Sequence, residues 1–324
     1  MTTNAPLALP QTSKNNLTVI FAPAGVGKTT LIGTLFAKHL FPKDGEVRFL
    51  ALDPNAEDGL VSAIKTYNVV LEPGQLTIAR PKKDDGSAFE ATLRSCLKTA
   101  RAKAQLPSAK PDPKSGRELV DRLEDIIELL IKFEGIDVAT GKAAPPTLSK
   151  DFKENTVLVI DSWTQFVLEL TSGLNQENLL QPEQRDWNQM NNAVSSILAT
   201  LASLPCKVVI LTHCDELILP KSDKPNDVAL HTVLPVFGTS KKNKDLAASK
   251  CSNVLFMQTS NGTRQIRTKS WTSWGDPFTI CRSNTINNNH AGLKVSISED
   301  EYTKMPGLIF SLAQLLWGKP LETK

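Results

Sequence analysis

Runs of consecutive apolar and β-branched residues recur along the chain. The strongest are LTVIFA from residue 17, EVRFLAL from residue 46, TVLVID at 156–161 and KVVILTH at 207–213. Unbroken runs of this length are typical of parallel strands buried on both faces, whereas half-exposed strands alternate polar and apolar positions. The pattern therefore predicts an α/β fold in which helices flank a mostly parallel central sheet.

Segments with helical spacing of apolar residues lie between these runs. TTLIGTLFAKHLF predicts a helix directly after the first strand, and further helices are expected near 60–67 and at about 186–203. A weaker strand is expected at 75–80, and a long loop at 215–250. After that loop, SNG separates two strand-like runs, which predicts a late β-hairpin ending in RQIRTKSW.

Composition divides the chain into three parts. Residues 1–15 are polar and contain proline, which is typical of a flexible N-terminal arm, and residues 16–274 form the predicted core. The core is interrupted at 81–150 by an insertion rich in lysine, proline, glycine and serine. The insertion is expected to be helical where apolar residues share one helix face, at Leu119, Leu123, Ile126, Ile127 and Leu130. Residues 275–324 are predicted to be a C-terminal extension that ends in a helix at PGLIFSLAQLLWG.

Charge and cysteine content exclude several classes of protein. The 324 residues include 37 basic and 34 acidic ones, and a net charge of +3 is too balanced to indicate nucleic-acid binding by itself. The five cysteines lack C-x-x-C spacing, so we expect reduced thiols rather than a disulfide framework or a zinc site. With no signal-like N-terminus and no run of 18 apolar residues, a cytoplasmic protein without a membrane segment is expected.

A phosphate-binding loop is predicted at 22–29, where APAGVGKT fits the pattern G-x-x-x-x-G-K-[ST] except for Ala22 at its first position. In such a loop, backbone N–H groups surround the phosphates at a helix N-terminus. Lys28 is expected to reach the β and γ phosphates of ATP, and Thr29 to ligate Mg²⁺. The first position lies where the strand leaves the sheet, so Ala22 should not prevent binding. The predicted nucleotide-binding residues are Ala24, Gly25, Val26, Gly27, Lys28, Thr29 and Thr30.

Acidic residues follow two of the predicted strands. Asp161 ends the run TVLVID and is expected to hold Mg²⁺ through water. Some ATPases carry the water-activating glutamate directly after this aspartate, but here the next residue is Ser162. The remaining candidates for the base come after the second strand, in LDPNAEDG, and are Asp53, Glu57 and Asp58, unless this segment is only a solvated acidic turn. Asp53 lies closer to the strand end, and Glu57 has the more usual chemistry. The choice between them stays open.

Other polar residues lie near later strand ends. Thr212 and His213 close the run KVVILTH, where a hydroxyl or a neutral imidazole could bind a phosphate, or could be merely structural. Arg267 and Lys269 are two residues apart and share a strand face, either for function or as a solvated basic edge. The loop 215–250 contains six lysines with His231 and Phe237, a composition that suits single-stranded nucleic acid.

The order of these motifs resembles phage-type RecA-like P-loop ATPases. These include the AAA-domain nucleotide-binding proteins of bacteriophages and the RecA-like branch of the Sak single-strand annealing proteins. The resemblance covers about two-thirds of the chain. It is carried by APAGVGKTT (22–30), the acidic turn after Asp53, VLVIDSWTQF (157–166), RDWNQMNN (185–192), VVILTHCDE (208–216), LPVFG (234–238) and SNVLFM (252–257).

The resemblance implies a RecA-like core that hydrolyses ATP with Mg²⁺. It also implies that Thr212 or His213 senses the γ-phosphate, and that Arg267 or Lys269 acts on the nucleotide of a neighbouring subunit. A homo-oligomer would follow. The loop 215–250 would contact single-stranded DNA, in the annealing or exchange of strands during phage recombination or replication in the host cytoplasm.

Two alternative functions stay open at the level of the sequence. A helicase or translocase motor is one, although no extra helicase domain is evident. A nucleotide-dependent adaptor that does not hydrolyse ATP is the other, because DS replaces DE and the acids of DPNAEDG are spread out.

Overall fold

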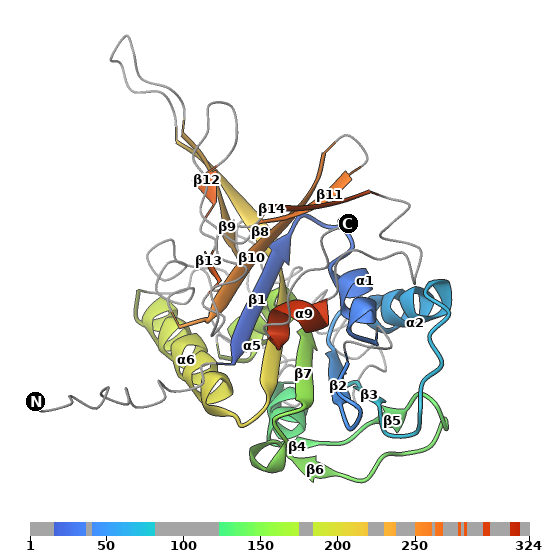
Figure 1. Ribbon diagram of the computed structural model, residues 1–324. Coiled ribbons are helices and arrows are strands. Elements are labelled where there is room, and N and C mark those ends of the chain that lie inside the picture. The colour runs from blue at the N-terminus through green and yellow to red at the C-terminus, as the bar shows by residue number, and fades with distance from the viewer. Residues whose placement is uncertain are drawn as a thin grey trace, which may run out of the picture.

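The computed structural model describes residues 16–36, 41–81, 123–174, 184–219, 230–237, 250–260, 263–267, 278–279, 282–283, 294–298 and 312–317. At its centre lies a sheet with the strand order β14-β11-β10-β1-β8-β7-β2-β3-β5 (Figure 1). From β10 to β3, all neighbouring strands are parallel. These strands are β10 (Asn253–Ser260), β1 (Leu17–Ala22), β8 (Lys207–Leu219), β7 (Thr156–Asp161), β2 (Glu46–Ala51) and β3 (Leu76–Ala79).

Helices cover both faces of this sheet. One face carries α1 (Lys28–Gly33) with a following 3-10 turn (Thr34–Phe36), α2 (Ala56–Thr66) and α9 (Leu312–Leu316). The other carries α5 (Trp163–Leu174), α6 (Gln184–Ser203) and the helical residues 123–131. On β1, the fully buried Ile20 packs toward α1, α2 and α9, and the fully buried Phe21 packs toward α5 and α6. The predicted α/β fold, with a mostly parallel central sheet flanked by helices on both faces, is therefore confirmed.

The late hairpin is also confirmed. β11 (Thr263–Arg267) runs antiparallel to β10, and β14 (Lys294–Ser298) continues the sheet beyond it. β13 (Arg282–Ser283) pairs with the start of β10, and β12 (Phe278–Thr279) pairs with β9 (Leu230–Pro235). Strands from the predicted C-terminal extension thus pair with strands of the core.

The loop predicted for 215–250 contains two strand segments. β8 continues past His213 to Leu219, and β9 returns antiparallel to it, with Asp215 opposite Leu234. The loop prediction is therefore wrong for 215–219 and 230–235. Apolar runs do not reveal these strands, because CDELIL and LHTVLP interrupt their apolar residues with polar ones. Residues 220–229 and 238–249 lie outside the described part of the chain.

The inserted segment is described from residue 123 onward. Its helix buries Ile126 and Leu129 in the core, while Leu119 lies outside the described residues. The helical interpretation is wrong after residue 131, where β4 (Lys132–Phe133), β5 (Ile136–Asp137) and β6 (Thr147–Leu148) follow. β5 pairs antiparallel with β3. A Cβ on Gly135 would lie 2.4 Å from the Ile78 carbonyl oxygen, so glycine permits this close approach.

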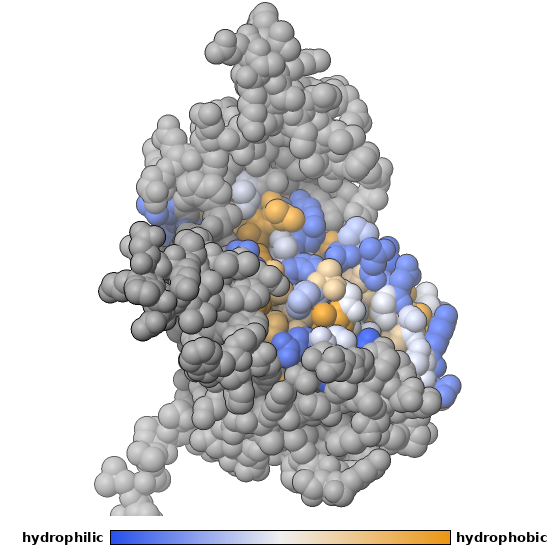
Figure 2. All heavy atoms as spheres, turned by 90° about the horizontal axis from the view of Figure 1, so that it is seen from above, coloured by the Kyte–Doolittle hydropathy of each residue, from blue (hydrophilic) through white to orange (hydrophobic). Residues whose placement is uncertain are grey.

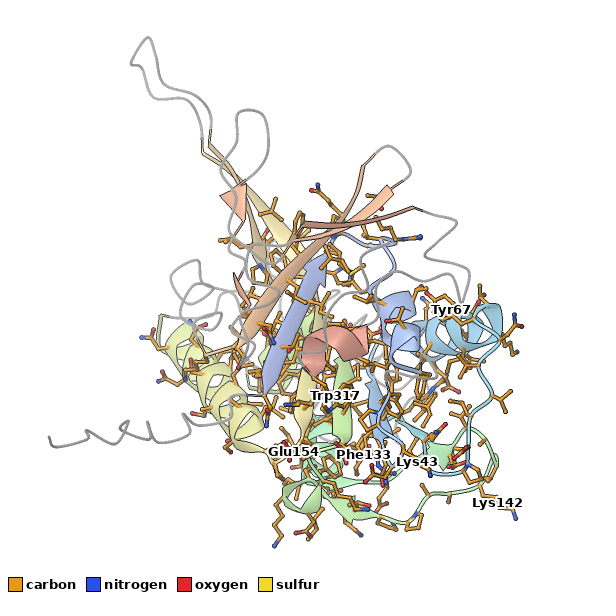
Figure 3. All side chains as sticks on the ribbon, viewed as in Figure 1. Lys43, Tyr67, Phe133, Lys142, Glu154 and Trp317 are labelled. Carbon is orange, nitrogen blue, oxygen red and sulfur yellow. The ribbon has the colours of Figure 1, made fainter. Side chains whose placement is uncertain are left out.

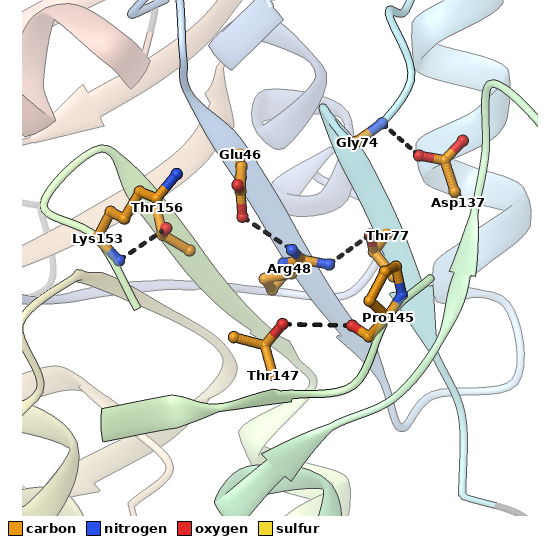
Figure 4. A network of polar contacts seen from close by, with 9 residues as sticks. All are labelled: Glu46, Arg48, Gly74, Thr77, Asp137, Pro145, Thr147, Lys153 and Thr156. Carbon is orange, nitrogen blue, oxygen red and sulfur yellow. Dashed lines mark hydrogen bonds and ion pairs between the residues drawn. The ribbon is translucent and has the colours of Figure 1, made fainter. Parts of the chain in front are cut away.

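Polar contacts fix the amino ends of β2 and β3 (Figure 4). The buried Arg48 donates from Nη1 to Thr77 Oγ1 and from Nη2 to the Glu46 carboxylate, both at 2.8 Å. Burial alone would raise the pKa of Asp137, but hydrogen bonds from Gly74 and Thr140 hold it below its usual value. Of these contacts, the Gly74–Asp137 hydrogen bond connects the inserted segment to the amino end of β3.

The last described helix, α9, packs on the 3-10 turn that directly follows α1. Leu312 and Ala313 are fully buried, and the Leu312 N–H donates to Thr34 Oγ1 at 2.9 Å. Trp317, labelled in Figure 3, follows. Its ring meets that of Phe41 edge-on with the centroids 6.0 Å apart. The C-terminal residues therefore support the helix that begins at the phosphate loop.

Candidate nucleotide-binding site

Several of the predicted site residues, among them Asp161 and His213, lie at the carboxyl edge of the parallel strands. β8 lies between β1 and β7, so Ala22 of β1 pairs with His213, and Asp161 of β7 pairs with Leu211. Ligands of open α/β sheets bind at this edge, because the loops leaving parallel strands converge there. Figure 2 views the molecule from this side, where the described surface mixes hydrophilic and hydrophobic residues.

The phosphate loop connects β1 directly to α1. Gly25 (φ 76°) and Gly27 (φ 97°) adopt the left-handed backbone conformation, and Gly27 forms the N-cap of α1. An added Cβ on Gly25 would meet no atom within 4 Å, so conformation and not space requires glycine there. Ala24 and Gly25 are exposed. The loop thus combines accessible backbone with a helix N-terminus, the combination that binds anions.

Lys28 closes the loop from inside. Its Nζ donates to the carbonyl oxygens of Ala22 and Pro23, both at 3.1 Å, and the side chain is buried. Burial lowers the pKa of Lys28, while nearby Asp161, Cys214 and Asp53 favour its charged form. Ala22 therefore contributes through its carbonyl group, which glycine would provide equally, and this explains why alanine is compatible with the loop.

Thr29 and Asp161 meet across the site. The Thr29 hydroxyl donates to Asp161 Oδ2 at 2.6 Å, and the Asp161 carboxyl is buried. The pKa of Asp161 is raised to about 6, mainly by burial and also by Asp53, against the opposing effects of the Thr29 hydrogen bond and Lys28. A hydroxyl and a carboxylate oxygen are the hard ligands that Mg²⁺ takes from a protein when phosphate and water complete its shell. The two residues therefore fit Mg²⁺.

Ser162, the residue directly after Asp161, caps a helix. Its hydroxyl accepts a hydrogen bond from the Gln165 N–H at 3.3 Å, and its carbonyl accepts one from Phe166 at 3.1 Å. Serine is a preferred residue at helix N-termini because its oxygen satisfies such unpaired N–H groups. The residue thus starts α5 and leaves the role of the base to other side chains.

The candidate bases occupy different surroundings, and Asp58 is exposed in the first turn of α2. The N–H groups of Leu52 and Asp53 donate to the Asp161 carbonyl at 2.6 and 3.1 Å, and Asp53 influences the pKa values of Lys28, Asp161 and His213. Glu57 lies in the first turn of α2 and forms an ion pair with Arg80 at 2.5 Å. Asp53 therefore lies within electrostatic reach of Lys28 and Asp161, whereas Glu57 pairs with Arg80.

His213 and Thr212 belong to a network at the end of the parallel part of β8. Thr164 Oγ1, in the first turn of α5, accepts from the His213 N–H at 2.9 Å and lies 3.1 Å from Thr212 Oγ1. Thr212 Oγ1 also donates to the Val236 carbonyl at 2.8 Å. Burial, and then Lys28, lower the pKa of His213, which favours a neutral imidazole at pH 7.

Sequence reasoning missed Thr164. Its signal was present in DSWT, a hydroxyl three residues after the strand-end aspartate, but its partner Thr212 lies 48 residues away in the sequence. Only the pairing of β7 with β8 brings the two strand ends together.

Sequence reasoning named Arg264 as part of the basic hairpin but missed its contact with the phosphate loop. The Arg264 Nε donates to the carbonyl oxygen of Val26, in the phosphate loop of the same chain, at 2.9 Å. For the predicted pair from this hairpin, the structure describes less. Arg267 ends β11 opposite Phe256 in the register, and its side chain and all of Lys269 lie outside the described residues.

The predicted DNA-binding residues are only partly described. Phe237 is buried in the core, so the prediction that it contributes an aromatic surface to this segment is wrong. Its carbonyl accepts a hydrogen bond from Trp163 Nε1 at 3.5 Å. Lys250 Nζ donates to the Ser195 carbonyl of α6 at 3.0 Å. The other five lysines of 215–250 and the side chain of His231 lie outside the described residues.

Searches for metal clusters and membrane spans gave negative results within the described ranges. No group of three or more His, Cys, Asp or Glu residues there is placed to hold a metal ion. Among the same residues, no helix combines the length and apolar character needed to cross a bilayer.

Comparisons with known proteins gave matches only among solved structures, since no family model and no curated protein matches the chain. One match is the KaiC-like protein PH0186 from Pyrococcus horikoshii OT3, with 12% identity, TM-score 0.32 and 78% of each chain covered. Another is a DnaB-like replicative helicase, with 13% identity and TM-score 0.32, covering 90% of this chain. The chain spans 58% of that helicase. The functional assignment therefore rests on the geometry of the site.

Proposed function

We propose that the protein is a Mg²⁺-dependent RecA-like ATPase. One observation carries the proposal: Lys28, Thr29, Asp161 and Asp53 come together from three separate segments at the carboxyl edge of the sheet, beside a glycine-containing loop at a helix N-terminus. A structural glycine turn would not require a buried lysine next to a buried aspartate, an arrangement that costs free energy on its own. The arrangement is chemically useful when phosphates and a cation are bound.

The residues of the loop bind the triphosphate in this proposal. N–H groups from Ala24 to Thr30 hydrogen-bond to phosphate oxygens, and Lys28 turns its ammonium group from the Ala22 and Pro23 carbonyls toward the β and γ phosphates. Thr29 and Asp161 would hold Mg²⁺, which when bound neutralises charge that develops on the phosphates. Asp161 must be ionised for this role.

Asp53 is proposed to orient and deprotonate the attacking water, and His213 to donate a hydrogen bond to the γ-phosphate or to that water. Asp53 influences the pKa values of Lys28 and Asp161, and Lys28 and Asp53 both influence the pKa of His213, so these charged groups lie within electrostatic reach of one another. A neutral His213 carries one N–H donor and one acceptor, which suits a sensor of bound phosphate.

Asp53→Asn is expected to lower kcat for ATP roughly 100-fold, because the amide cannot accept the proton, while the Kd for ATP changes little. Glu57→Gln removes the ion pair with Arg80 and is expected to change kcat less than about threefold. Steady-state phosphate release and equilibrium ATP binding by both variants decide between the two acids. The reverse order of effects would make Glu57 the base.

We further propose that the active form is a homo-oligomer in which Arg267 or Lys269 acts on a neighbour's nucleotide, and that single-stranded DNA is the partner. Support comes from the resemblance of the motifs and from the position of both residues in or directly after β11, the outgoing strand of the late hairpin. For DNA, support comes from the lysines of 220–229 and 238–249, because the first segment joins β8 to β9 and the second follows β9, and β8 carries His213.

The test is ATP hydrolysis by the full chain with and without single-stranded DNA. Stimulation of turnover by the DNA is the expected result and supports a role in strand annealing or exchange. Duplex unwinding driven by ATP would instead support the helicase or translocase motor. ATP binding without turnover under both conditions would contradict the ATPase and favour the adaptor.

A further inference from the structure

Arg264 is a charged side chain on the phosphate loop that the proposed mechanism leaves without a role. It comes from β11, 238 residues away from Val26 in the sequence, and donates from Nε to the Val26 carbonyl. Both residues are only partly exposed. A hydrogen bond from a charged donor in a partly buried setting is stronger than a neutral surface one. The contact is therefore strong enough to influence the conformation of the loop.

The peptide unit that Arg264 binds has a direct relation to phosphate binding. The Val26 carbonyl and the Gly27 N–H belong to the same planar trans unit and point in opposite directions. A donor that holds the carbonyl on the β11 side therefore also orients the Gly27 N–H toward the other side. Gly27 adopts φ 97° in the left-handed region. Because glycine has no Cβ, its backbone can take up many other conformations, and a contact is needed to select this one.

The position of Arg264 on β11 fits this function. Ile266, two residues later, is fully buried in the layer formed by α1, α2 and α9, so Arg264 and Ile266 share the face toward α1. Arg264 also lowers the pKa of Tyr67 against the larger opposite effect of burial, which places the guanidinium near the end of α2. The arginine is thus held by the fold on the α1 side of the sheet.

We propose that Arg264 is a positioning residue for the phosphate loop, acting within its own chain. It holds the Val26–Gly27 peptide in the orientation that binds phosphate and thereby connects the late hairpin to the loop. This role in phosphate binding rests on the proposed nucleotide function, but the hydrogen bond between Arg264 and Val26 can be tested without nucleotide. Arg264 differs in this from Arg267 and Lys269, which are proposed to act on a neighbouring subunit.

The test compares Arg264→Met, which keeps an apolar stem but no donor, with Arg264→Lys and with the control Gln265→Met on the same strand. In the nucleotide-free full chain, amide hydrogen exchange of residues 24–28 is expected to become at least about threefold faster in Arg264→Met and to stay unchanged in the control. Arg264→Lys keeps a charged donor and is expected to give an intermediate rate.

Binding and kinetics of the same variants provide the second readout. Arg264→Met is expected to raise the Kd for ADP and the KM for ATP about tenfold while kcat changes less than about threefold. A merely structural role would not separate KM from kcat in this way. Loop exchange and ADP affinity equal to those of the wild type in a folded Arg264→Met protein would overturn the proposal. Absence of ADP binding by the wild type would instead refute the nucleotide function, while the exchange rates would still judge the Arg264 bond.

Discussion

Replacing Lys28 with alanine is expected to abolish measurable ATP turnover, with a loss of roughly 10²–10³-fold or more in kcat. Lys28 is buried between the first residues of the loop and the Asp161 carboxyl region, and no other described ammonium or guanidinium group has contacts with the carbonyls of Ala22 and Pro23. Without it, negative charge on the transferred phosphate would lose its nearest cation. Phosphate release at saturating Mg²⁺ and ATP measures the effect.

The matched control is Lys65→Ala, which removes an exposed lysine from the last turn of α2. It should leave turnover within about twofold of the wild type, because solvent-exposed charges away from a site contribute little. Thermal melting confirms that both variants are folded. If Lys28→Ala still hydrolysed ATP, the assignment of residues 22–29 as the phosphate-binding loop would be wrong.

Replacing Asp161 with asparagine is expected to eliminate Mg²⁺-dependent turnover and at the same time to stabilise the nucleotide-free protein at neutral pH. Burial raises the pKa of Asp161 to about 6 from a usual value of 3.8, so ionisation at pH 7 costs up to about 3 kcal/mol of folding free energy. Asparagine can still accept the hydrogen bond from Thr29, and it carries no charge.

The predicted stabilisation by Asp161→Asn depends on pH, and its direction follows from the raised pKa of Asp161. A group whose pKa is raised by folding contributes stability below its unfolded pKa and loses it as the pH rises through the folded value. The difference in unfolding free energy between Asp161→Asn and the wild type should therefore be small near pH 4 and grow in favour of the variant between pH 4 and about 6. Urea denaturation in EDTA measures it. A variant that is less stable than the wild type at pH 7.5, or that still hydrolyses ATP, would contradict the proposed role.

Local features of the site could be predicted from the sequence. The four apolar runs and the spacing of glycines, Lys28 and Thr29 specify a strand, a loop and a helix, because each depends on neighbouring residues only. The placement of Asp161 at a strand end also followed from a single run of residues. The structure adds the hydrogen bond of 2.6 Å between Thr29 and Asp161. The sequence had predicted only that both residues bind the same Mg²⁺ ion.

Features that depend on distant pairing could not be predicted. Arg264 reaches Val26, and Thr164 reaches Thr212, because the strand order brings their segments together. The sequence pattern could not reveal the pairing of β8 with β9 beyond His213, since a strand whose apolar positions are interrupted looks like a loop. Likewise, the composition around Phe237 suggested an accessible aromatic, whereas the fold buries it under α5 contacts such as that of Trp163.

The central claim is that Lys28, Thr29, Asp161 and Asp53 form a site that hydrolyses ATP with Mg²⁺. Release of phosphate from ATP by the purified full chain, measured in Mg²⁺ and again in EDTA, tests it most directly. We expect turnover in Mg²⁺ and none in EDTA, because without the cation that Thr29 and Asp161 would hold, the negative charge of the triphosphate is not neutralised. Saturable binding of ATP without any release of phosphate in Mg²⁺ would contradict the claim.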